Sequence, residues 1–86
     1  MMDEMLRKAI CRILNRVHPA PLRVDTLESE CEIALGRVLT REEFRRELDA
    51  LVRADVVRIG KIGLLGAVET VLLTQTGVAE CSRAFG

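Results

Sequence analysis

The chain has 86 residues, which is enough for a single domain over positions 1–86 and leaves little room for a second. Hydrophobic residues make up 49% of it and charged residues 30%, a composition that excludes intrinsic disorder. The net charge is zero, and the two aromatic residues are too few to stack the bases of single-stranded nucleic acid.

Three cysteines, Cys11, Cys31 and Cys81, are widely spaced and odd in number, which argues against a disulfide framework. The sequence shows no signal-peptide pattern, and its apolar runs fall far short of the roughly 20 residues that cross a membrane. We therefore expect a cytoplasmic protein without a membrane partner. Its thiols should be reduced, with Cys11 and Cys31 buried as small apolar side chains.

Apolar residues at helical spacing predict a first helix over about 3–17, which Asp3 would cap and the prolines at 19 and 21 would end. A second helix is predicted over about 25–35. Asp25 and Glu28 have the offset of a capping box at its start, and Gly36 suits the left-handed residue at its end.

The third predicted helix covers about 40–53. Thr40 and Glu43 form a capping box, and Phe44, Leu48 and Leu51 mark its apolar face. Only residues 37–39 separate this helix from the second, a length typical of a helix-turn-helix.

The apolar period then changes. β-branched residues predict strands near 56–60 and 68–73, joined through a segment with glycines at 60, 63 and 66. Thr74 can cap a short last helix over about 75–83. The expected fold is α+β, with three helices, a β-hairpin wing and a short C-terminal helix. The predicted core is Leu6, Ile10, Leu14, Leu27, Cys31, Phe44, Leu48, Leu51, Val57 and Leu72.

Four segments resemble the winged helix-turn-helix superfamily in their order and spacing. They are ALGRVLT at 34–40, LDALV at 48–52, DVV at 55–57 and LTQTG at 73–77. More narrowly, the chain is similar to small winged-helix proteins of Mu-like bacteriophages. The resemblance implies binding of double-stranded DNA in transcriptional control, with a phage or prophage origin.

In winged-helix proteins the third helix enters the major groove and the wing reaches the DNA backbone. For this sequence, the resemblance implies six DNA-binding residues: Arg37, Arg41, Arg45, Arg46, Arg58 and Lys61. Glu42 and Asp49 lie four residues from arginines of the same helix face. That pattern equally describes a solvated face with weak ion pairs.

The predicted wing tip is apolar, with Ile62, Leu64 and Leu65 where a DNA-contacting wing is usually basic. Exposed, these side chains favour the alternative function, a winged helix used as a protein-interaction module. Folded back, Ile62 and Leu64 would join the domain's own core. The sequence leaves both open.

No cysteine or histidine spacing matches a metal site, and no nucleophile has an evident base, so we expect neither a metal, nor a cofactor, nor an enzyme. Apolar residues beyond the main helical stripes predict a homodimer joined through the first helix, the C-terminal segment, or both. These surplus apolar residues are Met5, Ala9, Cys11, Val78, Ala79 and Phe85.

Overall fold

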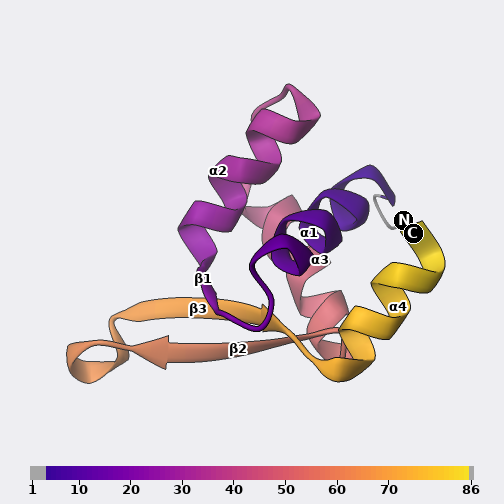
Figure 1. Cartoon of the computed structure of the whole chain (residues 1–86). Coiled ribbons are helices and arrows are strands. Elements are labelled where there is room, and N and C mark those ends of the chain that lie inside the picture. Colours follow the sequence, from indigo (N-terminus) through magenta and orange to yellow (C-terminus); the bar gives the residue numbers. More distant parts are fainter. Residues whose placement is uncertain (1–3, 86) are drawn as a thin grey trace.

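Four α-helices and three short strands make up the fold in the computed structural model, which describes residues 4–85, with side chains through residue 83 (Figure 1). In chain order the elements are α1 (Glu4–Val17), β1 (Leu22–Arg23), α2 (Val24–Leu35), α3 (Arg41–Arg53), β2 (Val57–Ile62), the 3-10 turn η1 (Leu64–Gly66), β3 (Val68–Leu73) and α4 (Gln75–Phe85). The predicted three helices, hairpin and final helix are confirmed. Asp3, the predicted cap of α1, lies outside the described residues.

The sheet is antiparallel with the order β1-β3-β2, and β3 is its central strand. β2 and β3 pair over six rungs from Val57 opposite Leu73 to Ile62 opposite Val68, and this hairpin is the wing. β1, which adds Leu22 opposite Val71, was not predicted. Two residues after a proline are too short a segment to display the alternation that marks a strand in sequence.

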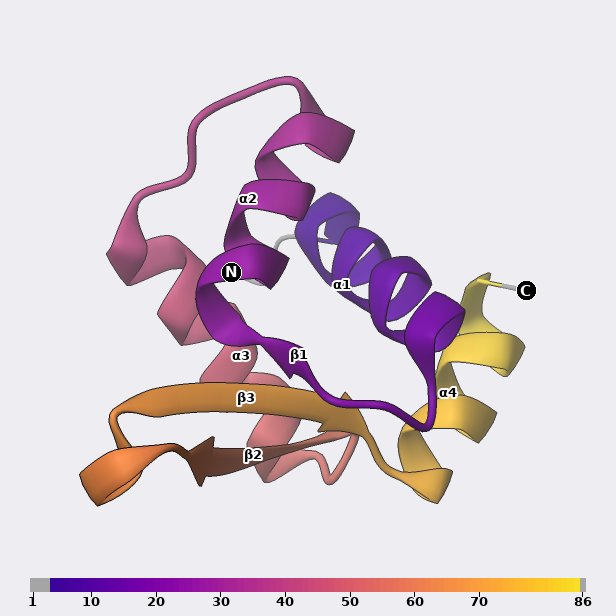
Figure 2. The ribbon, with the colours of Figure 1, turned by 60° about the vertical axis from the view of Figure 1, so that its left-hand side comes forward.

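α1 and α2 lie on one side of the sheet, α3 and α4 reach down to the base of the hairpin, and the wing projects beyond the helices (Figures 1 and 2). Nine of the ten predicted core residues are buried, and Leu72 is the exception, being only half-buried. Its neighbours Val71 and Leu73 are buried instead, at 0% and 1% exposure. Successive side chains of a strand point to opposite faces, so Leu72 cannot share the core with both.

Three helix ends follow the sequence. The Thr40 hydroxyl accepts a hydrogen bond from the Glu43 N–H at 3.1 Å, and a Glu43 carboxylate oxygen accepts one from the Thr40 N–H at 3.0 Å. Gly36 ends α2 in the left-handed region with φ 69°. The Thr74 hydroxyl accepts from the Gly77 N–H at 2.8 Å and so caps α4.

The predicted capping box of α2 is wrong. α2 begins one residue early, its N-cap is Arg23, and no side chain caps it. The Asp25 carboxylate instead accepts hydrogen bonds from Arg23 Nε at 3.2 Å and Nη2 at 2.9 Å. Because β1 runs directly into α2, an arginine takes the place that a capping side chain would need.

A disulfide joins Cys11 of α1 to Cys81 of α4, so the prediction that all thiols are reduced is wrong. α1 and α4 pack side by side and bring the two Cα atoms to 5.7 Å, a normal disulfide separation. The sequence separation of 70 residues gave no hint of this proximity. Cys31 is the free, fully buried cysteine that was expected.

The surplus apolar residues of α1 are mostly used inside the domain. Ala9 and Cys11 are buried at 7% and 4% exposure, contrary to their predicted place in a dimer interface. Met5 remains 64% exposed, while Val78 is half-buried and Ala79 exposed. Phe85 lies outside the described side chains.

Candidate nucleic-acid interface

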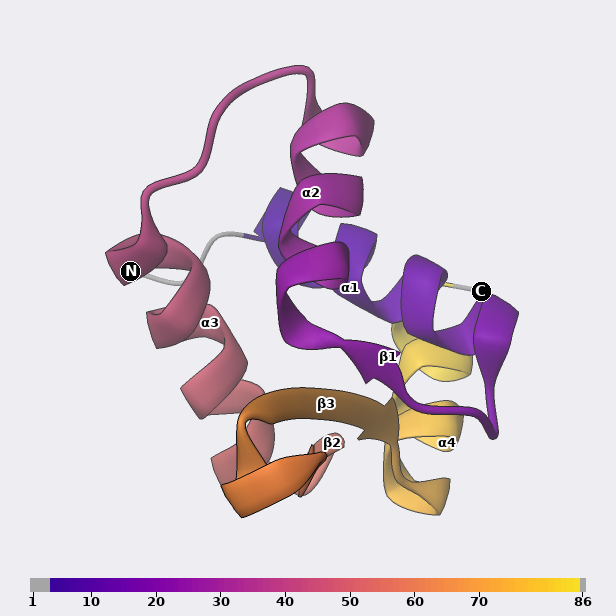
Figure 3. The same cartoon turned by 90° about the vertical axis from the view of Figure 1, so that its left-hand side faces the viewer.

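Core contacts fix the orientation of α3. Phe44, Leu48 and Leu51 are buried, which turns the opposite face of the helix to solvent. Arg45 and Arg46 are exposed there as predicted. In Figure 3 this helix and the wing border the same side of the molecule. We call the exposed face of α3 together with β2, β3 and their connecting tip the α3–wing surface.

Glu47 also holds α3 in place, and sequence reasoning missed it. It lies on the buried face of the helix at 5% exposure, where Arg7 of α1 donates to it from Nε at 2.9 Å. A buried carboxylate needs such a partner, because desolvation of an unpaired charge is costly. The sequence signal was present, since position 47 falls on the apolar stripe set by 44, 48 and 51.

The six predicted DNA-binding cations are all exposed, but their ionic surroundings differ. Arg37 donates to Glu43 at 3.1 Å, and Arg45 is held by Glu69. Arg41 and Arg46 have no ion pair with any residue that the structure describes. Of the three predicted DNA-binding arginines in α3, these two therefore need break no ion pair to meet a phosphate.

Arg45 and Glu69 form the main polar link between α3 and the wing. The guanidinium donates from Nη1 to Oε1 at 3.2 Å and from Nη2 to Oε2 at 3.0 Å. These hydrogen bonds lower the pKa of Glu69 below its ordinary value and raise the pKa of Arg45 above its ordinary value. Asp49 lies 3.8 Å from Nε of the same guanidinium. Sequence reasoning expected the Asp49 contact and missed Glu69, which is 24 residues away.

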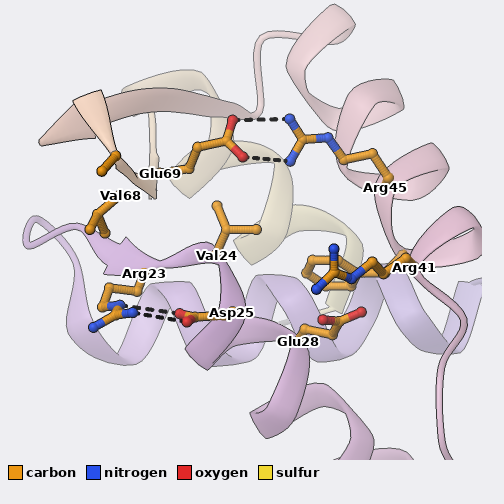
Figure 4. A pocket seen from close by; sticks show the side chains of 10 residues that line it. Arg23, Val24, Asp25, Glu28, Arg41, Arg45, Val68 and Glu69 are labelled. Carbon is orange, nitrogen blue, oxygen red and sulfur yellow. Dashed lines mark hydrogen bonds and ion pairs between the residues drawn. The ribbon is translucent and has the colours of Figure 1, made fainter. Parts of the chain in front are cut away.

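A cleft of about 450 Å³ opens between the start of α2, the start of α3 and β3. Figure 4 shows Glu69 and Arg45 bridging one side of it, with the Arg23–Asp25 pair and Arg41 on the other. Its lining residues are Arg23, Val24, Asp25, Glu28, Arg41, Phe44, Arg45, Ala67, Val68 and Glu69. Three carboxylates, those of Asp25, Glu28 and Glu69, line the cleft together with three arginines, so the positive charge of the α3–wing surface is interrupted.

The two basic residues of β2 do not share a face. Lys61 pairs across the hairpin with Glu69, whereas Arg58 pairs with Leu72 nearer the base of the wing. Three positions along a strand place side chains on opposite faces. Arg58 instead lines a separate hollow with His18, Asp55 and Thr74. The structure thus brings Lys61, and not Arg58, to the face that meets Arg45.

The wing tip carries an exposed apolar cluster. Ile62, Leu64 and Leu65 are 54%, 86% and 98% exposed, so the alternative in which Ile62 and Leu64 fold back into the core is excluded. Leu65 adopts φ 59°, a left-handed conformation that is costly for a residue with a Cβ. We call these three side chains the apolar wing tip.

Other kinds of site find little support. Within residues 4–85 no group of three His, Cys, Asp or Glu side chains is placed to hold a metal ion. Burial raises the pKa of Cys31 to about 12, which keeps this thiol protonated and poorly nucleophilic. Among the described helices, none has the length and apolar character needed to cross a membrane.

No protein-family model matches the chain, and no curated protein matches its sequence. Solved structures do match. RosR of H. salinarum superposes with a TM-score of 0.78 at 18% identity, over 91% of this chain and 66% of that one. A candidate transcriptional regulator of Thermoplasma acidophilum gives 0.75 at 14%, over 99% of this chain and 83% of that one.

A candidate DNA-binding protein of Ralstonia eutropha superposes over the whole of both chains, with a TM-score of 0.72 at 18% identity. Together with the element order and sheet topology, this match decides the architecture. The fold is a winged helix-turn-helix. At such identities the likeness concerns the fold alone, because proteins of one fold can differ in function through their surface residues. The narrower resemblance to Mu-like phage proteins stays a prediction.

Proposed function

We propose that this winged-helix domain binds double-stranded DNA through the α3–wing surface and acts in transcriptional control. The observation that carries the proposal is the pair of exposed arginines in the N-terminal half of α3, Arg41 and Arg46, which have no ion pair within the described residues. Similarity to a candidate transcriptional regulator and a candidate DNA-binding protein supports it. An origin in a phage genome is a prediction from sequence resemblance alone.

The expected mode of binding follows from the geometry of α3. Its N-terminal half would enter the major groove with Arg41 and Arg46 toward phosphates or guanine edges. Lys61, on the α3 side of β2, would reach the backbone from the wing. Arg37 and Arg45 would first have to leave Glu43 and Glu69, and Arg58 would contribute least because it lies on the other face of the hairpin.

Replacing Arg41 and Arg46 together by alanine should weaken duplex binding about tenfold or more. It should also flatten the dependence of affinity on salt by about two logarithmic units, because each phosphate contact releases nearly one counterion. Fluorescence anisotropy with a labelled duplex at several salt concentrations measures both effects.

Arg12 and Arg16 of α1 provide the matched control, since both are exposed and neither has an ion pair in the described part of the chain. Their double alanine variant has the same charge as the test variant and should keep the wild-type salt dependence. Equal weakening by both variants would mean that net charge, and not α3, governs binding.

The apolar wing tip favours a second candidate function, contact with another protein. Leu64 and Leu65 are almost fully solvated, and clustered exposed aliphatic side chains usually mark an interaction surface. Serine at both positions should leave DNA affinity nearly unchanged and should impair only a protein interface at the tip.

We also propose that the protein is a homodimer joined through α1, α4 or both. Met5, 64% exposed on α1, supports this. Sedimentation at tens of micromolar should give twice the monomer mass, and it should do so for the Leu64→Ser/Leu65→Ser variant as well. A monomer would contradict the proposal. Loss of the dimer in that variant alone would move the interface to the wing tip.

A further inference from the structure

Glu69 occupies the position at Arg45 that a DNA phosphate would need. Its carboxylate meets the guanidinium in a two-point contact, with oxygens at 3.2 Å and 3.0 Å from the two terminal nitrogens. A phosphate offers arginine the same pair of oxygens, so the carboxylate and a phosphate are direct competitors for this group. Figure 4 shows the pair bridging one side of the cleft, with Arg45 extending from α3.

The pair contributes little to holding α3 in place. Phe44, Leu48 and the ion pair of Arg7 with the buried Glu47 already anchor the helix, and the two strands of the wing are held together by pairing at six positions. The two partners are 44% and 34% exposed, and exposed ion pairs contribute little to folding. Separating Arg45 from Glu69 therefore costs little free energy, and the fold does not depend on this ion pair.

The charge of Glu69 is permanent near neutral pH, because Arg45 and, more weakly, Lys61 hold the pKa of the carboxyl below its ordinary range. Glu69 thus confronts any approaching phosphate with a full negative charge. It also sits opposite Lys61 on the hairpin, so a single carboxylate offsets two of the predicted DNA-binding cations.

Resting on the proposed function, we propose that Glu69 is a determinant of DNA affinity that holds Arg45 away from phosphate in the free protein. Contact between Arg45 and DNA then requires Arg45 to exchange a carboxylate for a phosphate, and the wild type binds a mixed-sequence duplex without that contact. This exchange limits affinity for duplexes in general. It confines tight binding to sites where other contacts, such as those of Arg41 and Arg46, are good enough to offset the lost pair.

The test is the Glu69→Gln variant, which removes the charge and keeps the shape. Binding of a mixed-sequence 20-base-pair duplex should tighten about five- to tenfold at about 50 mM salt. The plot of log affinity against log salt should steepen by about one unit, as expected for one additional phosphate contact. A purely structural role for Glu69 would weaken binding and leave that slope unchanged. Circular dichroism melting checks that the fold is kept.

Glu80→Gln is the matched control. Glu80 is exposed and pairs with Arg83 on α4, so its replacement also frees one arginine and changes the net charge equally, but outside the α3–wing surface. Wild-type affinity in this variant together with the gain in Glu69→Gln supports the inference. The inference is overturned if Glu69→Gln binds the duplex no more tightly than the wild type. It is also overturned if Glu80→Gln raises the affinity as much as Glu69→Gln does. If neither the wild type nor any variant binds the duplex, the proposed function itself fails and this inference fails with it.

Discussion

Reduction of the Cys11–Cys81 disulfide should lower the free energy of unfolding by about 4 kcal/mol, because the bond closes a loop of some 70 residues in the unfolded chain. That is a large share of the roughly 5–15 kcal/mol by which natural domains are stable. The bond ties α4 to α1, so α4 should be the first element to loosen. Urea denaturation followed by circular dichroism, with and without reductant, measures the difference.

Counting thiols provides an independent check. The oxidised protein should show one reactive thiol when denatured, from Cys31, and three after reduction. Folded, it should show almost none, because Cys31 is fully buried and burial raises its pKa to about 12. The Cys11→Ala/Cys81→Ala variant is the control and should not respond to reductant. Three thiols in the unreduced denatured protein would contradict the bond.

Gly77→Ala should destabilise the domain by about 3 kcal/mol, the upper end of the usual cost of overpacking. A Cβ at this position would lie 1.9 Å from the backbone oxygen of Val56 and 2.9 Å from its carbonyl carbon. Both neighbours are backbone atoms at the start of the wing, so no change of side-chain rotamer can relieve the clash. In an unconstrained helix the same change would stabilise by about 1 kcal/mol, so the sign of the effect is itself diagnostic.

Gly60→Ala serves as the comparison. At this position in β2 a Cβ would meet only the Thr70 hydroxyl at 3.4 Å, an ordinary contact, and we expect a change below about 0.5 kcal/mol. Thermal melting of both variants and the wild type measures these differences in stability. Equal melting temperatures for Gly77→Ala and wild type would mean that α4 does not approach Val56 so closely.

Local sequence signals predicted the helices well because their determinants lie within a few residues. The capping box of Thr40 and Glu43, the left-handed Gly36 and the cap at Thr74 each form as the spacing indicates. The resemblance at 73–77 also has a physical reason, since Gly77 is where α4 passes against the backbone of Val56.

What the sequence did not predict depends on contacts between distant segments. Cys11 meets Cys81 only because α1 and α4 pack together, and Arg45 meets Glu69 only because the wing folds beside α3. The face of a strand residue is equally hard to foresee when every position is apolar. Val71, Leu72 and Leu73 all suit a core, and only the pairing with β2 and β1 turns Leu72 away.

The candidate site divides in the same way. All six predicted cations are exposed, which periodicity alone could indicate. Which of them has a carboxylate partner depends on tertiary structure, and this separates Arg41 and Arg46 from Arg37 and Arg45. The apolar wing tip was visible in sequence, but its exposure was settled only by the conformation of the turn.

The most direct test of the central claim is a titration of the wild-type protein with a mixed-sequence duplex at about 50 mM salt, where even non-specific DNA-binding proteins associate measurably. We expect saturable binding that weakens steeply as salt rises, with a slope of about two to three logarithmic units from Arg41, Arg46 and Lys61. Absence of binding at about 100 µM protein would contradict DNA binding by this winged helix, since non-specific dissociation constants ordinarily lie at or below that concentration.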